Sequence, residues 1–260
     1  MVVLKIKAVL FDLGNTLVKT WIPEVTYQNV LASLGIDRSI EEIQGALAKT
    51  EEEFKESNYR SRYGEATYAE YWERWDAQVL TYLGISGSEN LAKEILARWF
   101  DHADCVTYSD TRVTLNRLKR MDLKLGLIST AYEEDIDAIL EKAGLAKGLF
   151  DIVVGANTVK KEKHHPDVFR HALGKLSVRS EETLFVGDHV DNDYKGAKAV
   201  GMHALLIERE DKTLPLPLPT ENEVEISRIP FDIDIQEQNG QTNLRRVTED
   251  SSIRQMIKHC

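Results

Sequence analysis

The sequence predicts an α/β fold in which a Rossmann-like, doubly wound parallel sheet carries a small inserted all-helical domain. Apolar, strand-forming runs alternate with helical patterns in two parts of the chain, residues 1–18 and 111–210. Such alternation is typical of a parallel sheet with helices on both faces. Residues 19–110 between these parts hold helical patterns instead of strands, which predicts a separate helical domain.

The expected elements of the α/β parts are short apolar runs for the strands and apolar residues at helical spacing for the helices. The expected strands are Ala8 to Phe11, Leu123 to Ile128, Ile152 to Val154, Thr183 to Val186 and Met202 to Ile207. The expected helices are Thr111 to Met121, Tyr132 to Ala143, one that begins near Pro166, and one over Tyr194 to Val200. Proline suits a first helical position, where its missing N–H has no helical partner.

The inserted part contains four helical patterns separated by glycine-containing breaks. They cover Val25 to Leu34, Ile40 to Phe54, Tyr68 to Leu83 and Glu89 to Phe100. Within the break from Ser57 to Gly64, the segment Tyr59 to Gly64 interleaves Arg60 and Arg62 with tyrosines. These two arginines either contact the anionic or ring portion of a substrate or are solvated, while the neighbouring aromatic side chains pack the helices together.

The first expected strand ends on a carboxylate, Asp12, which is followed by the turn Gly14 to Thr16. Open α/β sheets bind their ligands at the carboxyl ends of the strands. Asp12 is therefore a candidate nucleophile or metal ligand. The alternative is a turn residue or the cap of a following helix.

Two further fragments place complementary side chains after apolar runs. Ser129 and Thr130 follow the strand that ends at Ile128, where hydroxyl groups and the amides of the next helix start can bind an oxyanion. Thr130 with Glu133 also fits a capping box, and the two interpretations are compatible. Lys163 lies in a loop ahead of the helix at Pro166, where it either neutralises phosphate and carboxylate charge or is solvated.

The fourth fragment is a loop with three acids, Asp188, Asp191 and Asp193, after the strand Thr183 to Val186. Gly187 permits a tight turn there. Acids this close repel one another unless a cation is present, and oxygen ligands of this kind suit Mg²⁺. A calcium loop of the EF-hand type is excluded because the spacing and the distal glutamate are wrong.

In this order, the four fragments resemble the signature motifs of the haloacid dehalogenase superfamily, and in particular its phosphatases with a small, C1-type helical cap. The first motif, Asp-x-Asp-x-Thr, is matched by Asp12 to Thr16 except at its second acid. The other motifs are matched in order by Ser129, by Lys163 within Lys163 to Phe169, and by Gly187-Asp188 with Asp193 ahead of Gly196-Ala197. The likeness covers roughly the first 207 residues.

The resemblance implies a hydrolase in which Asp12 attacks phosphorus and forms an aspartyl-phosphate that water then cleaves. The implied catalytic residues are Asp12, Ser129 and Lys163. The implied phosphate-binding residues are Ser129, Thr130 and Lys163, and Thr16 helps to fix the loop after the first strand. The implied Mg²⁺ ligands are Asp12, the backbone carbonyl of Gly14, Asp188 and Asp193.

The departure from the family pattern is Gly14, which replaces the aspartate that normally serves as general acid and base. General acid–base catalysis is typically worth about 10² to 10⁴ in rate, so we expect slow turnover of alkyl phosphates. Other members of the family read Asp-Leu-Gly-Asn here and are regarded as phosphatases. His164 and His165, which replace the usual Pro and Asp of the third motif, either supply an imidazole in the useful pKa range or have no catalytic role.

Three functions fit these residues. The leading one is a Mg²⁺-dependent phosphatase of a small phosphorylated metabolite. The second is carbon–halogen hydrolysis of the 2-haloacid dehalogenase type, which needs no metal and which Asp188 disfavours by repelling a carboxylate substrate. The third, prompted only by Gly14, is a catalytically weak phosphate-binding protein.

Composition excludes some partners. The 260 residues are 42% hydrophobic and carry a formal net charge of -10 at pH 7, which supports a good core plus a small second one and argues against an obligatory nucleic-acid partner. The first apolar run is too short for a transmembrane helix, so no membrane partner is expected. Cys105 and Cys260 do not suggest a disulfide framework, which fits a reducing cytoplasm. A monomer or homodimer is expected.

Residues 211–260 form a C-terminal extension that departs from the family. Three alternating prolines suggest an extended crossing, Phe231, Ile233 and Ile235 alternate with acids like an edge strand, and Ser251 or Ser252 is suited to capping a short terminal helix. The extension is expected to pack on the core, contact another subunit or remain partly disordered.

Overall fold

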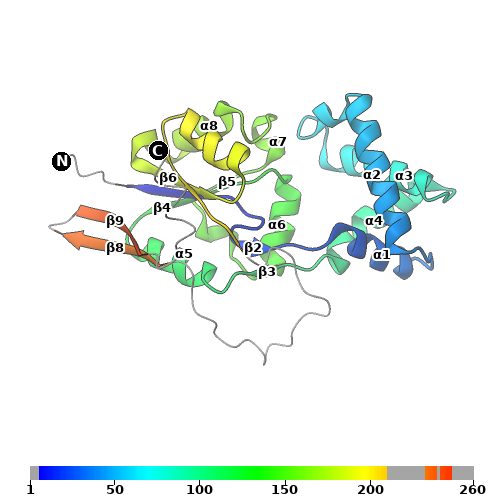
Figure 1. The fold of residues 1–260 in the computed structure, drawn as a ribbon, viewed down its shortest axis with the longest axis horizontal. Helices are drawn as coiled ribbons and strands as arrows, with labels where there is room; N and C mark the ends of the chain where they lie inside the picture. The colour runs from blue at the N-terminus through cyan, green and yellow to red at the C-terminus, as the bar shows by residue number, and fades with distance from the viewer. Residues whose placement is uncertain (1–5, 210–231, 239–240, 248–260) are drawn as a thin grey trace.

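The computed structural model describes residues 6–209, 232–238 and 241–247, and its centre is a five-stranded parallel sheet (Figure 1). The strand order is β5-β4-β1-β6-β7. The strands are β1 (Ala8–Phe11), β4 (Lys124–Ile128), β5 (Ile152–Val154), β6 (Thr183–Gly187) and β7 (His203–Leu206). This arrangement confirms the predicted doubly wound α/β class, with β1 between β4 and β6.

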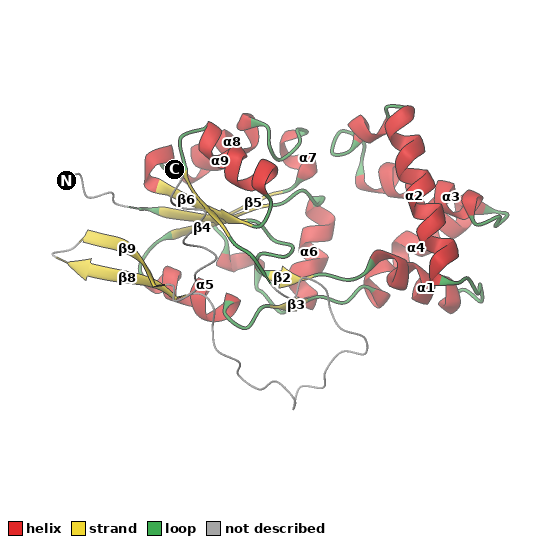
Figure 2. Ribbon diagram, viewed as in Figure 1, coloured by secondary structure: helices red, strands yellow, loops and turns green. Residues whose placement is uncertain are grey.

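Helices cover both faces of the sheet (Figure 2). They are α5 (Thr111–Arg120) and α6 (Glu133–Lys142) on one face, and α8 (Pro166–Leu176) with the short α9 (Gly196–Ala199) on the other. The side chains of the wholly buried β1 need apolar partners on both faces. Val9 and Phe11 pack in the hydrophobic cluster with α5 and α6, whereas Ala8 and Leu10 pack in the cluster with α8. Side chains alternate between faces along a strand, so a strand buried on both sides is apolar throughout.

The inserted helices form a group of their own beside the sheet (Figure 1). They are α1 (Pro23–Ser33), α2 (Ile40–Glu56), α3 (Tyr68–Tyr82) and α4 (Ser88–His102). Capping boxes fix two of the starts, because Ser39 pairs with Glu42 ahead of α2 and Thr67 with Glu70 ahead of α3. We refer to the helical group and its loops, residues 20–105, as the cap.

Two short strands join the cap to the sheet domain. The strands β2 (Val18–Lys19) and β3 (Val106–Thr107) pair antiparallel where the chain leaves and re-enters the sheet domain. The sequence does not predict these strands, since two residues carry no periodic pattern. The guanidinium of Arg209 fixes the same place by contacting Asp110 Oδ2 at 2.9 Å and donating to Thr16 O at 2.8 Å.

Two other expectations for the α/β part need correction. The structure has no capping box between Thr130 and Glu133: Tyr132 is the N-cap of α6, and the Glu133 carboxylate instead accepts a hydrogen bond from Thr158, next to the short α7 (Ala156–Val159). The helix expected over residues 194–200 is divided between a wide helical turn, η4 (Val190–Lys195), and α9.

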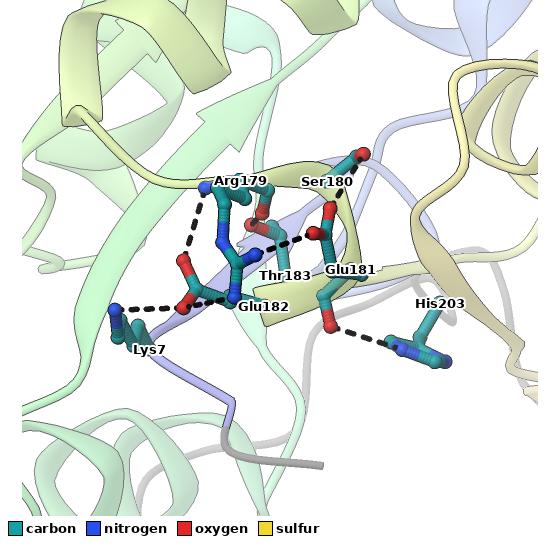
Figure 3. Close-up of polar contacts among 7 residues, drawn as sticks. All are labelled: Lys7, Arg179, Ser180, Glu181, Glu182, Thr183 and His203. Atoms are coloured by element: carbon teal, nitrogen blue, oxygen red, sulfur yellow. Dashed lines mark hydrogen bonds and ion pairs between the residues drawn. The ribbon is translucent and has the colours of Figure 1, made fainter.

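A network of charged side chains holds the amino-terminal edge of the sheet (Figure 3). The carboxylate of Glu182 lies 2.7 Å from Lys7 Nζ and 3.0 Å from Arg179 Nη2. Arg179 and Lys7 lower the pKa of Glu182 to about 2. A carboxylate with a lowered pKa stabilises the fold above its unfolded pKa, and this contribution is lost as the pH falls toward the folded value.

We expect Glu182→Gln to lower the melting temperature at pH 7, and the difference from the wild type to narrow as the pH falls below about 4.5 toward 2. Thermal unfolding followed by circular dichroism across this range measures it. Glu181→Gln is the matched control, because Glu181 also pairs with Arg179 but is 54% exposed, and exposed pairs contribute about 0 to 1 kcal/mol. Equal effects of the two variants at pH 7 would contradict the prediction.

Part of the C-terminal extension is described. The strands β8 (Asp232–Gln238) and β9 (Gln241–Val247) pair antiparallel, so Ile233 and Ile235 lie in a strand as expected. The alternating prolines, Phe231 and the expected terminal helix at Ser251 or Ser252 lie outside the described residues. How the extension packs stays a prediction. Within the described part of the chain, no helix has the length and apolar character needed to cross a bilayer.

Candidate active site

Three neighbouring strands deliver polar side chains to one edge of the sheet. Asp12 follows β1, Ser129 follows β4 and Asp188 follows β6. The backbone fixes two of them, because Asp12 N donates to Val186 O at 2.9 Å and Ser129 N donates to Val154 O at 2.9 Å. Parallel strands in register end together, so residues far apart in sequence meet at this edge.

Lys163 brings a buried cation to the same place. Its Nζ lies 2.5 Å from Asp12 Oδ1 and 2.8 Å from Asp193 Oδ1, and its side chain is 2% exposed. The loop that carries Lys163 precedes α8, which begins at Pro166. A buried ammonium requires charged partners of this kind, since an unpaired charge in the interior is very costly. Lys163 is therefore part of the site and is not the solvated surface residue of the alternative interpretation.

The pKa values reflect this mutual dependence. Burial raises the pKa of Asp12; the Lys163 ammonium opposes this effect and Asp193 adds to it. Burial alone would lower the pKa of Lys163, but Asp12 and Asp193 outweigh it and the net pKa is raised. Lys163 thus remains protonated and faces two carboxylates.

Three carboxylates are close enough to share a metal ion. One oxygen from each of Asp12, Asp188 and Asp193 lies within 4.8 Å of the other two. These three acids and the Lys163 ammonium carry a formal charge of minus two together, in a region where Asp12 and Asp193 are buried. A hard divalent cation with oxygen ligands, such as Mg²⁺, fits this donor set and offsets this charge.

The position of Asp193 depends on Gly187. A Cβ at Gly187 would lie 2.3 Å from Asp193 Oδ2, and His189 N donates to the same oxygen at 3.0 Å. The backbone of Gly187 does not adopt a positive φ. Glycine is therefore needed there for the close approach of Asp193, which corrects the expectation that it supplies a tight turn.

The two hydroxyl residues after β4 differ in exposure. Ser129 is 7% exposed and its Oγ accepts a hydrogen bond from Ala131 N at 3.2 Å, whereas Thr130 is exposed. Ser129 lies at the sheet edge that carries Asp12. Thr16 is buried in the loop after β1, and Arg209 holds its carbonyl.

Comparison with known proteins identifies the family of this chain. Residues 6–201 match the sequence pattern of the haloacid dehalogenase-like hydrolases. The chain belongs to this family. It is 31% identical over 201 residues to a glyceraldehyde 3-phosphate phosphatase of Methanocaldococcus jannaschii, and the aligned region covers 76% of this chain and 82% of that protein. A glyceraldehyde 3-phosphate phosphatase of Methanopyrus kandleri is 27% identical, covering 78% and 84% of the two chains.

Solved structures share the fold of this haloacid dehalogenase-like hydrolase. The L-2-haloacid dehalogenase of Xanthobacter autotrophicus superposes with a TM-score of 0.56 at 24% identity, covering 78% of this chain and 77% of that chain. The family thus includes proteins named for phosphate-ester and for carbon–halogen chemistry on one fold. This enzyme is a hydrolase, and its site residues must indicate which bond it cleaves.

Several residues singled out from the sequence of this hydrolase have other contacts. Asp191 is exposed and pairs with Lys195 at 2.7 Å. Arg60 Nη1 donates to Tyr71 Oη at 3.2 Å, within the cap, and Arg62 is exposed. His164 is exposed and lies near Glu162, whereas His165 is half-buried and lies near Asp167. A role of the arginines in substrate binding stays a prediction.

Two features of the hydrolase site were missed in the sequence. The Arg209 contact to Thr16 O comes from beyond β7, where a lone arginine carries no motif. Tyr132, only three residues after Ser129, is wholly buried and contacts the cap. Its proximity to Ser129 in the sequence was the only available signal, and a tyrosine at a helix start does not reveal its partner.

Proposed function

We propose that this hydrolase is a Mg²⁺-dependent phosphatase that removes the phosphoryl group from a small phosphorylated metabolite through an aspartyl-phosphate on Asp12. The proposal rests mainly on the convergence of three acids: one carboxylate oxygen from each of Asp12, Asp188 and Asp193 lies within 4.8 Å of the other two. Lys163 forms ion pairs with Asp12 and Asp193. The likeness to two proteins named glyceraldehyde 3-phosphate phosphatase supports the substrate class.

The residues divide the reaction between them. A carboxylate oxygen of Asp12 attacks phosphorus, the bond from phosphorus to the leaving oxygen breaks, and water later cleaves the acyl phosphate to release phosphate and restore Asp12. Ser129 and Lys163 bind phosphoryl oxygens, with Thr130 beside them. Because negative charge spreads over those oxygens in the transition state, a buried ammonium beside the nucleophile is the type of group that this step requires.

The metal site uses the remaining acids. Asp12, Asp188 and Asp193 are the side-chain ligands that we assign to Mg²⁺, and the backbone carbonyl of Gly14 is the fourth protein ligand. When bound, Mg²⁺ supplies positive charge to the phosphoryl oxygens. Asp193 is held by Lys163 and His189 N, so its carboxylate is oriented before the metal binds.

The test is hydrolysis of a panel of phosphorylated metabolites, including glyceraldehyde 3-phosphate, with Mg²⁺ and with EDTA, and with Asp12→Asn as the blank. We expect phosphate release that requires Mg²⁺ and Asp12. Activity that persists in EDTA would refute the metal-dependent mechanism. Release by Asp12→Asn equal to that of the wild type would refute the nucleophile.

The dehalogenase alternative is supported by the shared fold alone. A metal-free site for a carboxylate substrate gains repulsion from Asp188, which lies with Asp12 and Asp193. The same EDTA arm, run with 2-chloropropionate and halide detection, distinguishes the two activities. Binding of inorganic phosphate without turnover of any substrate would support the weak phosphate-binding alternative.

We expect Gly187→Ala to weaken Mg²⁺ binding by about 10-fold to 100-fold, the usual cost of disturbing a group that supports a metal ligand. A Cβ at this position lies 2.4 Å from Asp193 Cγ, so the carboxylate must move. Isothermal titration calorimetry with Mg²⁺ measures the change. Gly148→Ala is the control, since nothing lies within 4 Å of its added Cβ. Unchanged affinity in Gly187→Ala would remove Asp193 from the ligand set.

A further inference from the structure

Tyr132 joins the sheet domain to the cap through its hydroxyl group. Gly64 N donates to Tyr132 Oη at 2.9 Å, and Tyr132 Oη donates to Ala66 O at 3.4 Å. Tyr132 is wholly buried, and its ring packs 4.8 Å from that of Tyr63, centroid to centroid. A buried hydroxyl with both a donor and an acceptor partner fixes the position of the chain that supplies them.

Two further contacts hold the same cap segment against the sheet domain. Tyr68 Oη donates to Asp135 Oδ1, in the first turn of α6, at 2.8 Å. Gly64 lies against α7, because a Cβ there would be 2.6 Å from Ala156 O. The cap segment 63–68 therefore rests on the start of α6 and on α7. It is the sequence neighbour of Arg60 and Arg62, which are the candidate substrate contacts of the cap.

The residues that contact cap segment 63–68 lead directly into the loop that carries Ser129. Ala131 N donates to Ser129 Oγ at 3.2 Å, and Ala156 N donates to Ala131 O at 2.8 Å. Glu133 N donates to Asn157 Oδ1 at 3.0 Å. The loop from Ser129 to Glu133 is thus held by α7 on one side and by the cap, through Tyr132, on the other.

We propose that Tyr132 is a positioning residue that couples docking of cap segment 63–68 to the Ser129 loop, so that phosphate bound at this loop and the docked cap stabilise each other. The proposal rests on the assignment of Ser129 to phosphate binding. It follows that Tyr132 acts on substrates whose organic part reaches the cap and has less effect on those that consist of little more than the phosphoryl group. Coupling of this kind is reciprocal. If bound phosphate stabilises the docked cap, the docked cap strengthens phosphate binding by the same factor.

The experiment uses hydrogen exchange of the full chain, read by mass spectrometry over residues 59–68, with Mg²⁺ and with or without inorganic phosphate. Tyr132→Phe keeps the ring and removes the hydroxyl. We expect exchange of segment 63–66 to become about 3-fold to 10-fold faster, the effect of losing one net hydrogen bond. Phosphate should slow this exchange in the wild type and much less in the variant.

The matched control is Tyr59→Phe, because the Tyr59 ring contacts Phe54, Tyr71 and Arg74, all within the cap. Tyr68→Phe, which removes the hydrogen bond to Asp135, should act in the same direction as Tyr132→Phe. A far-ultraviolet circular dichroism spectrum and melting curve of each variant verify folding. Unchanged exchange at segment 63–66 in folded Tyr132→Phe would overturn the docking role.

Kinetics provide the second arm. With glyceraldehyde 3-phosphate and acetyl phosphate as probes, Tyr132→Phe should raise KM for the larger probe several-fold more than for acetyl phosphate, and Tyr59→Phe should not. If hydrogen exchange in Tyr132→Phe is faster but phosphate slows it equally in the wild type and the variant, the coupling is overturned and the phosphatase assignment stays intact. Failure of the wild type to bind phosphate, measured by calorimetry on the same samples, would instead overturn the assignment on which the proposal rests.

Discussion

Asp12→Asn is expected to lower phosphate release by roughly 10⁵-fold or more, the scale of loss when a covalent nucleophile of a hydrolase is removed. In the proposed mechanism the Asp12 carboxylate attacks phosphorus, and an amide is a far weaker nucleophile. Steady-state release of inorganic phosphate with the best substrate of the panel, at saturating Mg²⁺, measures the change.

The fold should survive this substitution. Lys163 loses one of its two carboxylate partners but keeps Asp193 at 2.8 Å, so the buried ammonium is still paired. Asp191→Asn is the matched control, because it makes the same chemical change at an exposed acid that pairs with Lys195. We expect nearly full activity from it. Comparable rates from the two variants would show that Asp12 is not the nucleophile.

The strand-end acids show what the sequence could predict. Asp12 and Asp188 each follow an apolar run that becomes a buried strand. Once the sheet is parallel, their meeting follows from topology, because β1 and β6 are neighbours. The fold class was equally accessible, because it depends on periodicity summed over many residues.

The contacts of Lys163 show where prediction from sequence stops. Its loop could be placed ahead of α8, but its burial between Asp12 and Asp193 depends on the packing of that loop over the sheet edge. Residues 151 or 30 positions apart are joined here, and no local pattern encodes such a pairing. The same applies to Tyr132 and Gly64, which are separated by 68 residues.

The failed capping box shows how tertiary contacts override a local motif. Thr130 and Glu133 have the right spacing, yet Thr158 and Asn157 of α7 take the Glu133 carboxylate and amide. The sequence predicts a turn role for Gly187, whereas in the structure the glycine leaves room for Asp193. In both cases the local sequence suggests the commonest role of the residue, whereas the contact that determines its role comes from a different element.

Gly14→Asp is expected to raise turnover of an alkyl phosphate by about 10² or more, which lies within the usual contribution of general acid–base catalysis. An alkoxide leaving group needs a proton, and Gly14 has no side chain to supply one. A p-nitrophenolate leaving group needs none, so the gain on p-nitrophenyl phosphate should be small. The ratio of the two rates, compared between wild type and variant, is the measurement.

The structure has room for the first carbon of the new side chain. A Cβ at Gly14 meets only Thr20 Cγ2, at 3.5 Å, and the backbone there does not require glycine because its φ is not positive. Gly14→Asn is the control, since it has the same size and no acidic proton. If the aspartate and asparagine variants gain equally on the alkyl phosphate, the gain comes from packing or loop order. If neither gains, another group already protonates the leaving oxygen, and the site is complete without a second acid.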